Sequence, residues 1–326
     1  MSEKSNIEWT DSTHNFWRGC TKVSPGCKNC YAEKLVTTRL GGQWGEGAPR
    51  TRSAFFNAPL DWNKKQWICD VCGRPSDRRY DHSCTGRPED ACHTDNVTWH
   101  RRRVFSLSLG DWLDPEVPAE WLADMLNVVR RCPDLTWQLV TKRPELFKAR
   151  LFAAHKSLPC TAASMPVSSF IVDWVAGVAP KNIWLLASTE DQATLDQRAP
   201  VLLKIPAAVH GLSCEPLLGP LDLRGYKFDW LIAGGESGPG ARPCHIEWIR
   251  SIRDQAEAAN IPLFVKQLGS FCKSNAQLDP EYMARFWPSM EYEINCGGTL
   301  FKLKHKKGGD CTEWPTDLRI RQFPAQ

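Results

Sequence analysis

Residues 183–190 read Ile-Trp-Leu-Leu-Ala-Ser-Thr-Glu, an unbroken apolar run that ends in three polar side chains. A run without alternation of apolar and polar residues is typical of a strand that is buried on both faces of a parallel sheet. The same pattern recurs along the chain. We expect further strands over residues 15–18, 104–109, 137–140, 209–212, 230–233 and 263–265.

Helical segments separate most of these strands. Residues 118–131 carry apolar side chains at helical spacing, and residues 191–203 and 246–259 fit helices as well. The link over residues 214–228 is too rich in proline and glycine for a full helix. This alternation predicts an α/β fold, a full or partial (β/α) TIM-like barrel. In such a barrel the polar residues that follow each strand share one face, where catalytic residues lie.

The composition is that of a folded protein, because 42% of the 326 residues are hydrophobic and 24% are charged. The net charge of +4 is too small to indicate a nucleic-acid binder by itself. No stretch reaches the roughly 18 apolar residues of a membrane span, and residues 1–8 lack the apolar core of a secretory signal. We therefore expect a cytoplasmic protein without a membrane partner, in which clustered cysteines indicate metal rather than disulfides.

Three of the 14 cysteines, Cys20, Cys27 and Cys30, share one short segment. A structural zinc site needs four ligands, and His14 could be the fourth. Three cysteines can also hold a 4Fe–4S cluster in which one iron stays open for chemistry. The spacing alone leaves both interpretations open.

A second group of cysteines predicts a structural zinc site in a polar insertion over residues 67–98. It consists of Cys69, Cys72, Cys84 and Cys92. Cys69 and Cys72 have the spacing of a zinc knuckle, and His82 and His93 are substitute ligands. So polar a segment cannot build a core, and a metal gives it a reason to fold. The single cysteines are expected to be small buried hydrophobic residues. They are Cys132, Cys160, Cys214, Cys244, Cys272, Cys296 and Cys311.

These features divide the chain into four parts. Residues 1–66 form the N-terminal part of the barrel with the first cysteine group, and residues 67–98 form the zinc insertion. Residues 99–269 form the remainder of the barrel, with a mostly apolar insertion over 158–179. Residues 270–326 form a C-terminal extension, whose lysines we expect to be solvated charges. They are Lys302, Lys304, Lys306 and Lys307.

Five ordered blocks of sequence resemble a known family. They are Ile7-Glu8-Trp9-Thr10, the Gly19-Cys20 pair with Ser24-Pro25-Gly26-Cys27-Lys28-Asn29-Cys30-Tyr31-Ala32, Thr141-Lys142-Arg143-Pro144, Ser213-Cys214-Glu215-Pro216-Leu217-Leu218-Gly219-Pro220 and Gly234-Gly235-Glu236-Ser237-Gly238-Pro239. Outside the two insertions, nearly the whole chain is similar to the phage-borne three-cysteine-motif protein family. That family in turn resembles radical S-adenosylmethionine (SAM) enzymes.

The resemblance implies a barrel of the radical SAM type. It also implies a 4Fe–4S cluster on Cys20, Cys27 and Cys30, with SAM at the open iron and an electron donor as a partner. Reductive cleavage of SAM would then produce a radical that abstracts a hydrogen from the substrate. The implied cofactor contacts are Tyr31, Ser108, Asp111, Ser188, Glu190, Ser213, Gly234 and Gly235.

The remaining implied site residues follow other strands. Lys142 and Arg143 are the implied substrate contacts, and Glu215, Glu236 and Lys266 are the implied catalytic residues. Glu215 and Glu236 each follow a buried strand, where a carboxylate without a partner is costly. We therefore expect groups of the cofactor or substrate to pair with them.

The resemblance also suggests a substrate, because phages that carry such enzymes often hypermodify DNA bases. A thymidine-type base of phage DNA or its nucleotide is the expected substrate, and the host cytoplasm the expected location. The arginines of the zinc insertion could contact phosphates. They are Arg74, Arg78, Arg79 and Arg87. The alternative is a non-enzymatic protein with two zinc sites on a barrel scaffold, which binds nucleic acid or a protein partner.

Overall fold

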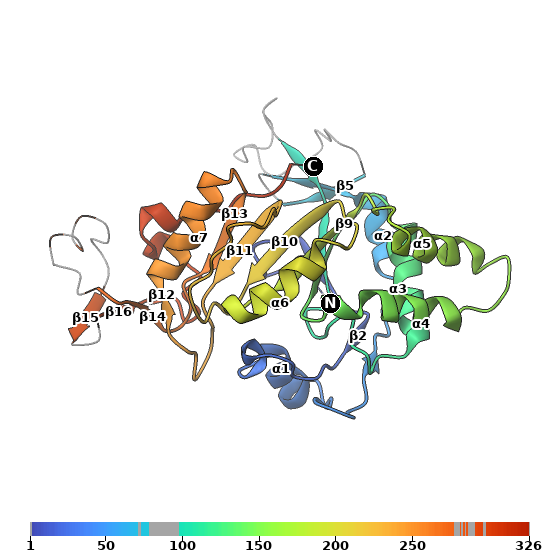
Figure 1. Cartoon of the computed structure of the whole chain (residues 1–326), viewed down its shortest axis with the longest axis horizontal. Helices are drawn as coiled ribbons and strands as arrows, with labels where there is room; N and C mark the ends of the chain where they lie inside the picture. The colour runs from blue at the N-terminus through green and yellow to red at the C-terminus, as the bar shows by residue number, and fades with distance from the viewer. Residues whose placement is uncertain are drawn as a thin grey trace.

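The centre of the protein is a seven-stranded sheet in the order β1-β7-β8-β9-β10-β11-β13, curled into a half-barrel (Figure 1). The computed structural model describes residues 2–70, 73–77, 98–276, 281, 283, 285, 291–295 and 298–325. All neighbouring strands of this sheet are parallel. The strands are β1 Ser12–His14, β7 Arg103–Ser106, β8 Thr136–Thr141, β9 Ile183–Ser188, β10 Val209–Cys214, β11 Trp230–Gly234 and β13 Leu263–Gln267. The predicted α/β partial barrel is therefore confirmed.

Helices connect most of these strands and pack on one face of the sheet. They are α3 Ala119–Arg131, α4 Phe147–Ser157, α5 Met165–Val175, α6 Gln192–Leu202 and α7 Ile246–Ala258. The helix α6 begins at a capping box, in which the Asp191 carboxylate accepts the N–H of Thr194 and the Thr194 hydroxyl accepts the N–H of Asp191. Residues 215–229, all of which are described, contain no helix, as predicted.

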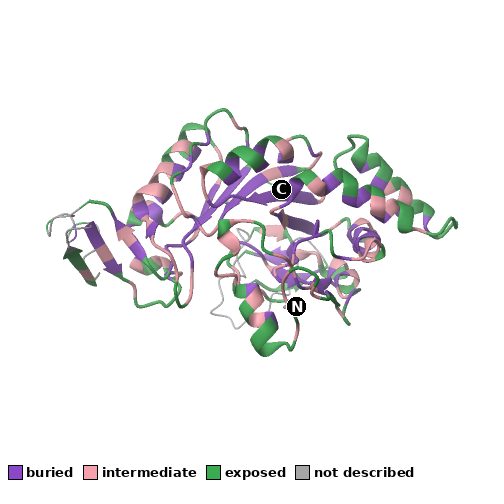
Figure 2. Cartoon of the chain, turned by 60° about the horizontal axis from the view of Figure 1, so that its bottom comes forward, coloured by how far each residue is buried: buried purple, intermediate pink, exposed green. Residues whose placement is uncertain are grey.

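The sheet buries both of its faces, and its residues alternate between two apolar clusters. Leu185 and Ala187 of β9 face the helices, whereas Trp184 and Leu186 face the opposite side. On that side the sheet is covered by Trp9 from the N-terminal segment and Phe323 from the C-terminal segment. Figure 2 shows the strands as the buried part of the molecule and the outer faces of the helices as exposed. Burial on both faces explains why the strands lack alternation in the sequence.

The strand predicted over residues 15–18 is wrong in position. The parallel strand is β1, whose residues Ser12, Thr13 and His14 are polar and buried. Trp17–Arg18 instead forms β2, which pairs antiparallel with β3, Thr51–Arg52, outside the main sheet. A pattern of apolar residues could not find β1, because its three residues are polar although they are buried. The Ser12 hydroxyl donates to the carbonyl oxygen of Glu3 over 2.6 Å, whereas His14 packs against aromatic rings.

The imidazole of His14 lies in the apolar core and not beside the cysteines. Its ring centroid is 4.4 Å from that of Phe16 and 5.7 Å from that of Trp62, and the residue has no solvent exposure. Burial lowers the pKa of His14 to about 4. The suggested role of His14 as a fourth zinc ligand is therefore wrong.

Besides the β2–β3 pair, two smaller sheets in the described part of the chain lie outside the half-barrel. The first joins β4 Trp67–Cys69, β5 Pro75–Ser76 and β6 Trp99–Arg101 at the base of the predicted zinc insertion. Cys69 is buried there, whereas Cys72, Cys84 and Cys92 lie outside the described residues, so the zinc site stays a prediction. The second sheet joins β12 Cys244–His245 to strands of the C-terminal extension. These are β14 Cys272–Ser274, β16 Gly298–Lys302 and β15 Glu291–Asn295.

The single cysteines divide into two kinds. Four are buried, as predicted: Cys132, Cys214, Cys244 and Cys272. The prediction is wrong for Cys160, which is exposed because it lies in a surface link between α4 and α5, and for Cys311, which is only half-buried at the start of a short 3-10 helix. Cys296 lies outside the described residues. None of the helices that the structure describes is long and apolar enough to cross a membrane.

The buried His14 makes folding depend on pH. Its pKa is about 4 in the folded chain against 6.5 in an exposed histidine, so the folded state resists protonation that the unfolded state accepts. This contribution is fully present above pH 6.5 and is lost as the pH falls toward 4. We expect the free energy of unfolding in urea to fall by about 2 to 3 kcal/mol between pH 7.5 and 4.5 through this residue.

The variant His14→Gln should lack that part of the pH dependence, and His155→Gln, on α4, should keep it. Equal slopes of unfolding free energy against pH in the wild type and in His14→Gln would contradict the prediction.

Candidate functional site

The segment that carries the three cysteines lies across the carboxyl edge of the half-barrel; we call residues 19–30 the cysteine loop. It begins where the Gly19 N–H donates to the carbonyl oxygen of Leu109 after β7, over 3.0 Å. Gly19 has a φ of +111°, and a Cβ there would lie 2.8 Å from the Arg50 side chain, so only glycine fits. The loop ends at Cys30, the N-cap of α1, Tyr31–Arg39.

Arg143 ties the loop to the end of β8. Its Nη1 lies 3.4 Å from Cys20 Sγ, and its Nη2 donates to the carbonyl oxygen of Thr21 over 2.7 Å. The same Nη1 also contacts Asp111 Oδ2 at 3.1 Å. The structure thus brings together two residues that the resemblance implied, Asp111 and Arg143, with one of the cysteines.

Glu190 supports the middle of the loop from the end of β9. Its carboxylate accepts the Ser24 hydroxyl over 2.6 Å and contacts Lys142 Nζ and Arg198 Nη1, each at 2.8 Å. Burial alone would raise the pKa of Glu190, but Lys142 and Arg198 hold it at about 2. Gly26 passes so close to this carboxylate that a Cβ would overlap it. The carboxylate is therefore ionised at neutral pH, with its charge matched by two cations.

Glu236 fastens the last part of the loop from the end of β11. It accepts Asn29 Nδ2 over 2.9 Å, and Arg242 forms a two-pronged ion pair with both of its oxygens. Arg242 also donates to the carbonyl oxygen of Pro25 over 2.8 Å. Burial raises the pKa of Glu236, but these hydrogen bonds outweigh it and leave the pKa below its usual value.

Glu215 and Lys266 form an ion pair at the same edge, with Nζ 3.0 Å from Oε1. Glu215 lies over Gly234, where a Cβ would come within 2.7 Å of its carboxylate. The side chains are 12% and 22% exposed, and neither forms a hydrogen bond or ion pair with the cysteine loop. The expectation that Glu215 and Glu236 lack partners within the protein is therefore wrong, because Lys266, Arg242 and Asn29 pair with them.

Most of the remaining implied cofactor contacts are hydrogen-bonded or packed against other parts of the protein. The Tyr31 hydroxyl donates to the carbonyl oxygen of Ser108, and Asn15 Nδ2 donates to the Ser108 hydroxyl. Ser188 and Ser213 are buried at the ends of neighbouring strands. Gly235 is packed against the backbone of the segment after β13, which leaves no room for a side chain.

The three thiols are half-buried. Burial and Asp111 raise the pKa of Cys20 to about 12, against the effect of Arg143, and burial also raises the pKa of Cys30. Among the described residues, no three His, Cys, Asp or Glu side chains converge on one point as a single metal ion requires. A lone zinc binds every thiolate at about 2.3 Å, whereas in a 4Fe–4S cluster each cysteine binds a different iron. With His14 in the core, the donors that the cysteine loop itself offers are its three thiols.

Sequence reasoning missed the residues that hold the loop in place. They are Asn29, Arg50, Asp114, Arg198 and Arg242. Arg50 and Asp114 form an ion pair with almost no exposure, and Arg50 also donates to the Thr21 hydroxyl over 2.8 Å. Asn29 lies inside the cysteine motif, and its amide could have indicated a hydrogen bond that holds the loop. The others are scattered along the chain and show no pattern.

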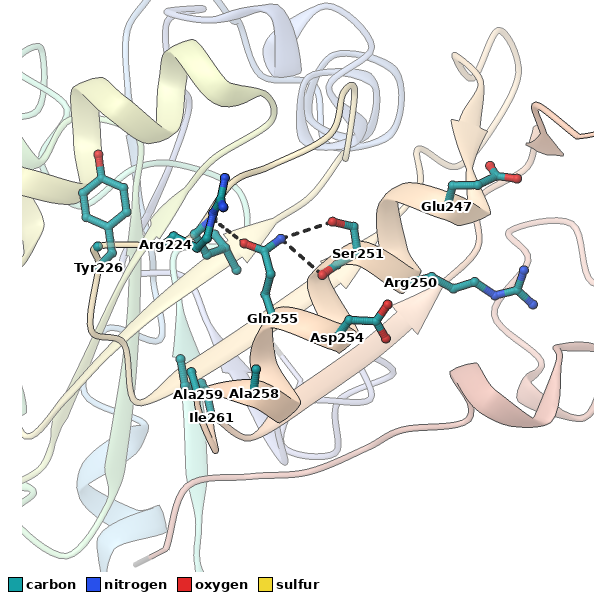
Figure 3. Close-up of a pocket in the computed structure, with 12 residues that line it drawn as sticks. Arg224, Tyr226, Glu247, Arg250, Ser251, Asp254, Gln255, Ala258, Ala259 and Ile261 are labelled. Carbon is teal, nitrogen blue, oxygen red and sulfur yellow. Dashed lines mark hydrogen bonds between the residues drawn. The ribbon is translucent and has the colours of Figure 1, made fainter.

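A hollow elsewhere on the surface does not belong to this edge. It is lined by α7 and by the link before β11, and Figure 3 shows Gln255 at its centre, bonded to Ser251. None of its lining residues comes from the cysteine loop or from the end of a strand.

The close contact between Gly26 and Glu190 gives a test of the loop's position. We expect Gly26→Ala to displace the loop at a cost of about 1 to 3 kcal/mol, because a methyl group would overlap the Glu190 carboxylate. Hydrogen exchange of the amides of residues 20–30 should become faster. In the control Gly219→Ala the new methyl would lie 3.9 Å from its nearest neighbour, so exchange should not change. Unchanged exchange in both variants would show that Glu190 does not support the loop.

Comparison with known proteins gives a family and no function. Residues 4–311 match the family described as "Protein of unknown function (DUF5131)". No curated protein and no solved structure matches the chain. The match covers most of the chain, including the cysteine loop and every strand of the half-barrel. The chain therefore belongs to the DUF5131 family.

Proposed function

We propose that the protein is a radical SAM enzyme that holds a 4Fe–4S cluster on Cys20, Cys27 and Cys30. The observation that carries this proposal is the attachment of the cysteine loop to the carboxyl edge of a parallel half-barrel, at the ends of β7, β8, β9 and β11. Catalytic groups of α/β barrels lie at that edge. A structural metal site would have no need of this position.

The bound cluster and SAM would supply a one-electron reductive cleavage of the sulfonium and the abstraction of a hydrogen atom from the substrate. The chain's own part is to fix positions and to limit the access of water. Buried or partly buried ion pairs at Asp111, Glu190 and Glu236 hold the loop still. Cys30 stands at the first turn of α1, where the partial positive charge of the helix favours a thiolate.

Glu215 and Lys266 are the groups that we assign to ligand binding. Asp111, Glu190 and Glu236 are engaged in holding the loop, whereas the Glu215–Lys266 pair is partly exposed and forms no hydrogen bond or ion pair with a loop residue. A carboxylate beside an ammonium matches the amino and carboxylate groups of SAM, or a polar substrate of mixed charge. We therefore expect Glu215→Ala to lower turnover far more than it lowers stability.

The C-terminal extension bears on the class of substrate. Its exposed turn over residues 304–307, Lys-His-Lys-Lys, is fixed to this edge through Ser270. The Ser270 hydroxyl donates to the carbonyl oxygen of Lys306 and accepts the N–H of Gly238, and the Ser270 N–H donates to the backbone carbonyl oxygen of Glu236. Among the described residues, no carboxylate forms an ion pair with Lys304, Lys306 or Lys307. The positive charge of this turn favours the proposal that the substrate carries phosphate, as a thymidine nucleotide or DNA does.

The proposed cluster gives the main test. After anaerobic reconstitution the wild type should be brown, contain iron and sulfide, and form 5′-deoxyadenosine from SAM and a reductant. Changing Cys20, Cys27 or Cys30 to Ala should each abolish iron–sulfur incorporation, because each thiolate holds one iron. Zinc content should not change. The control Cys160→Ala removes an exposed cysteine outside the loop and should have no effect.

Two results would contradict the proposal. One is a triple Ala variant of the loop cysteines that keeps its iron and sulfide. The other is a wild type with a full cluster that forms no 5′-deoxyadenosine.

The proposed substrate class has its own assay. A thymidine nucleotide and a thymidine-containing oligonucleotide are each added, and the rate of 5′-deoxyadenosine formation is measured at increasing salt. Lys306→Gln with Lys307→Gln should weaken stimulation by the active compound and lower its salt dependence. The same charge change at Lys181 and Lys204, which precede β9 and β10 at the opposite edge of the sheet, should change neither the stimulation nor its salt dependence. Equal effects of the two double variants would exclude the turn as a phosphate site.

A further inference from the structure

The guanidinium of Arg143 is held where it can act on only one of the three cysteines. Arg143 is 4% exposed, its Nη1 lies 3.4 Å from Cys20 Sγ, and its Nη2 donates to the carbonyl oxygen of Thr21. The other two thiols have different neighbours. Cys27 Sγ lies 3.8 Å from the Ser24 hydroxyl, and Cys30 stands at the start of α1.

Asp111 fixes the guanidinium in this orientation. It contacts Arg143 Nη1 at 3.1 Å and is itself held by the Thr141 hydroxyl and by the backbone N–H groups of Lys142 and Leu113, at 2.8 to 2.9 Å. The Arg143 N–H in turn donates to the Thr141 hydroxyl over 3.0 Å. The side chain is thus clamped from both ends, between a buried carboxylate and the cysteine loop.

This arrangement leaves Arg143 poorly suited to the role of substrate contact that the resemblance implied. A substrate group would have to displace Asp111, Cys20 or Thr21 from a nearly unexposed guanidinium. A hydrogen bond to a cysteine sulfur, by contrast, is one of the means by which a protein sets the reduction potential of an iron–sulfur cluster. An N–H donor withdraws electron density from the thiolate and stabilises the more electron-rich, reduced state.

We propose that Arg143, oriented by Asp111, is a positioning residue that raises the reduction potential of the cluster through Cys20. This inference rests on the proposed function. Asp111 offsets much of the net charge of the guanidinium, so the effect comes from the directed hydrogen bond to Cys20 more than from long-range charge. The cluster is then polarised toward one of its irons, the one bound to Cys20.

The test is the midpoint potential of the reconstituted cluster, followed by electron paramagnetic resonance during a reductive titration without SAM. Arg143→Gln should incorporate iron and sulfide and show a midpoint potential below that of the wild type. Arg143→Lys, which keeps the charge but not the paired donors, should also fall below the wild type. The matched control is Lys22→Gln, which removes a positive charge from the loop itself, from an exposed lysine that pairs with Glu33 of α1 rather than with a cysteine. Its shift should be clearly smaller.

The possible outcomes separate the inference from the function on which it rests. Potentials of Arg143→Gln and Arg143→Lys that equal the wild type value would overturn the inference and leave the radical SAM proposal intact. A shift in Lys22→Gln as large as in Arg143→Gln would also overturn it, because unspecific charge would then explain both. If the wild type holds no cluster, the proposed function itself fails. If Arg143→Gln does not assemble a cluster, the midpoint potential of Arg143→Lys is compared with that of the wild type instead.

Discussion

Glu190 is an ionised carboxylate whose side chain has no solvent exposure, and the architecture of the site depends on how its charge is matched. An isolated charge in such a position would be prohibitively costly. Lys142 from the end of β8 and Arg198 from α6 surround it, and Ser24 brings the cysteine loop onto it. Gly26 completes the contact, since no other residue lets the backbone pass so close. One buried charge therefore joins two strands, a helix and the loop.

The same principle divides the polar residues of the edge into two groups. Asp111, Glu190 and Glu236 each have cationic partners and each hold the cysteine loop, so their part in the site is to fix its geometry. Glu215 and Lys266 pair with each other, stay partly exposed and contact no loop residue. The chain thus separates the groups that hold the loop from a pair that is accessible to a ligand. The proposed chemistry needs both the residues that fix the loop and the pair that can bind a ligand.

The sheet was predictable from sequence because burial on both faces gives runs such as Ile183–Ala187 without alternation. The first strand was not, since Ser12, Thr13 and His14 are polar residues that are nevertheless buried. At the site, the strand-end residues Glu190, Glu215 and Glu236 were predictable from their place after apolar runs. Their partners Arg198 and Arg242 were not, because they come from a helix and a loop whose approach only the folded chain shows. Glu236 was accordingly expected to be a carboxylate without a partner in the protein, whereas in the folded chain it pairs with Arg242 and accepts a hydrogen bond from Asn29.

The central claim is that the cysteine loop holds a cluster with one iron left open. Mössbauer spectroscopy of protein reconstituted with ⁵⁷Fe, with and without SAM, tests it most directly. The account predicts the spectrum of a 4Fe–4S cluster in which one iron site changes when SAM is added, while the three cysteine-bound irons keep their parameters. A spectrum without iron–sulfur signals would contradict it. So would a complete cluster whose spectrum does not change when SAM is added.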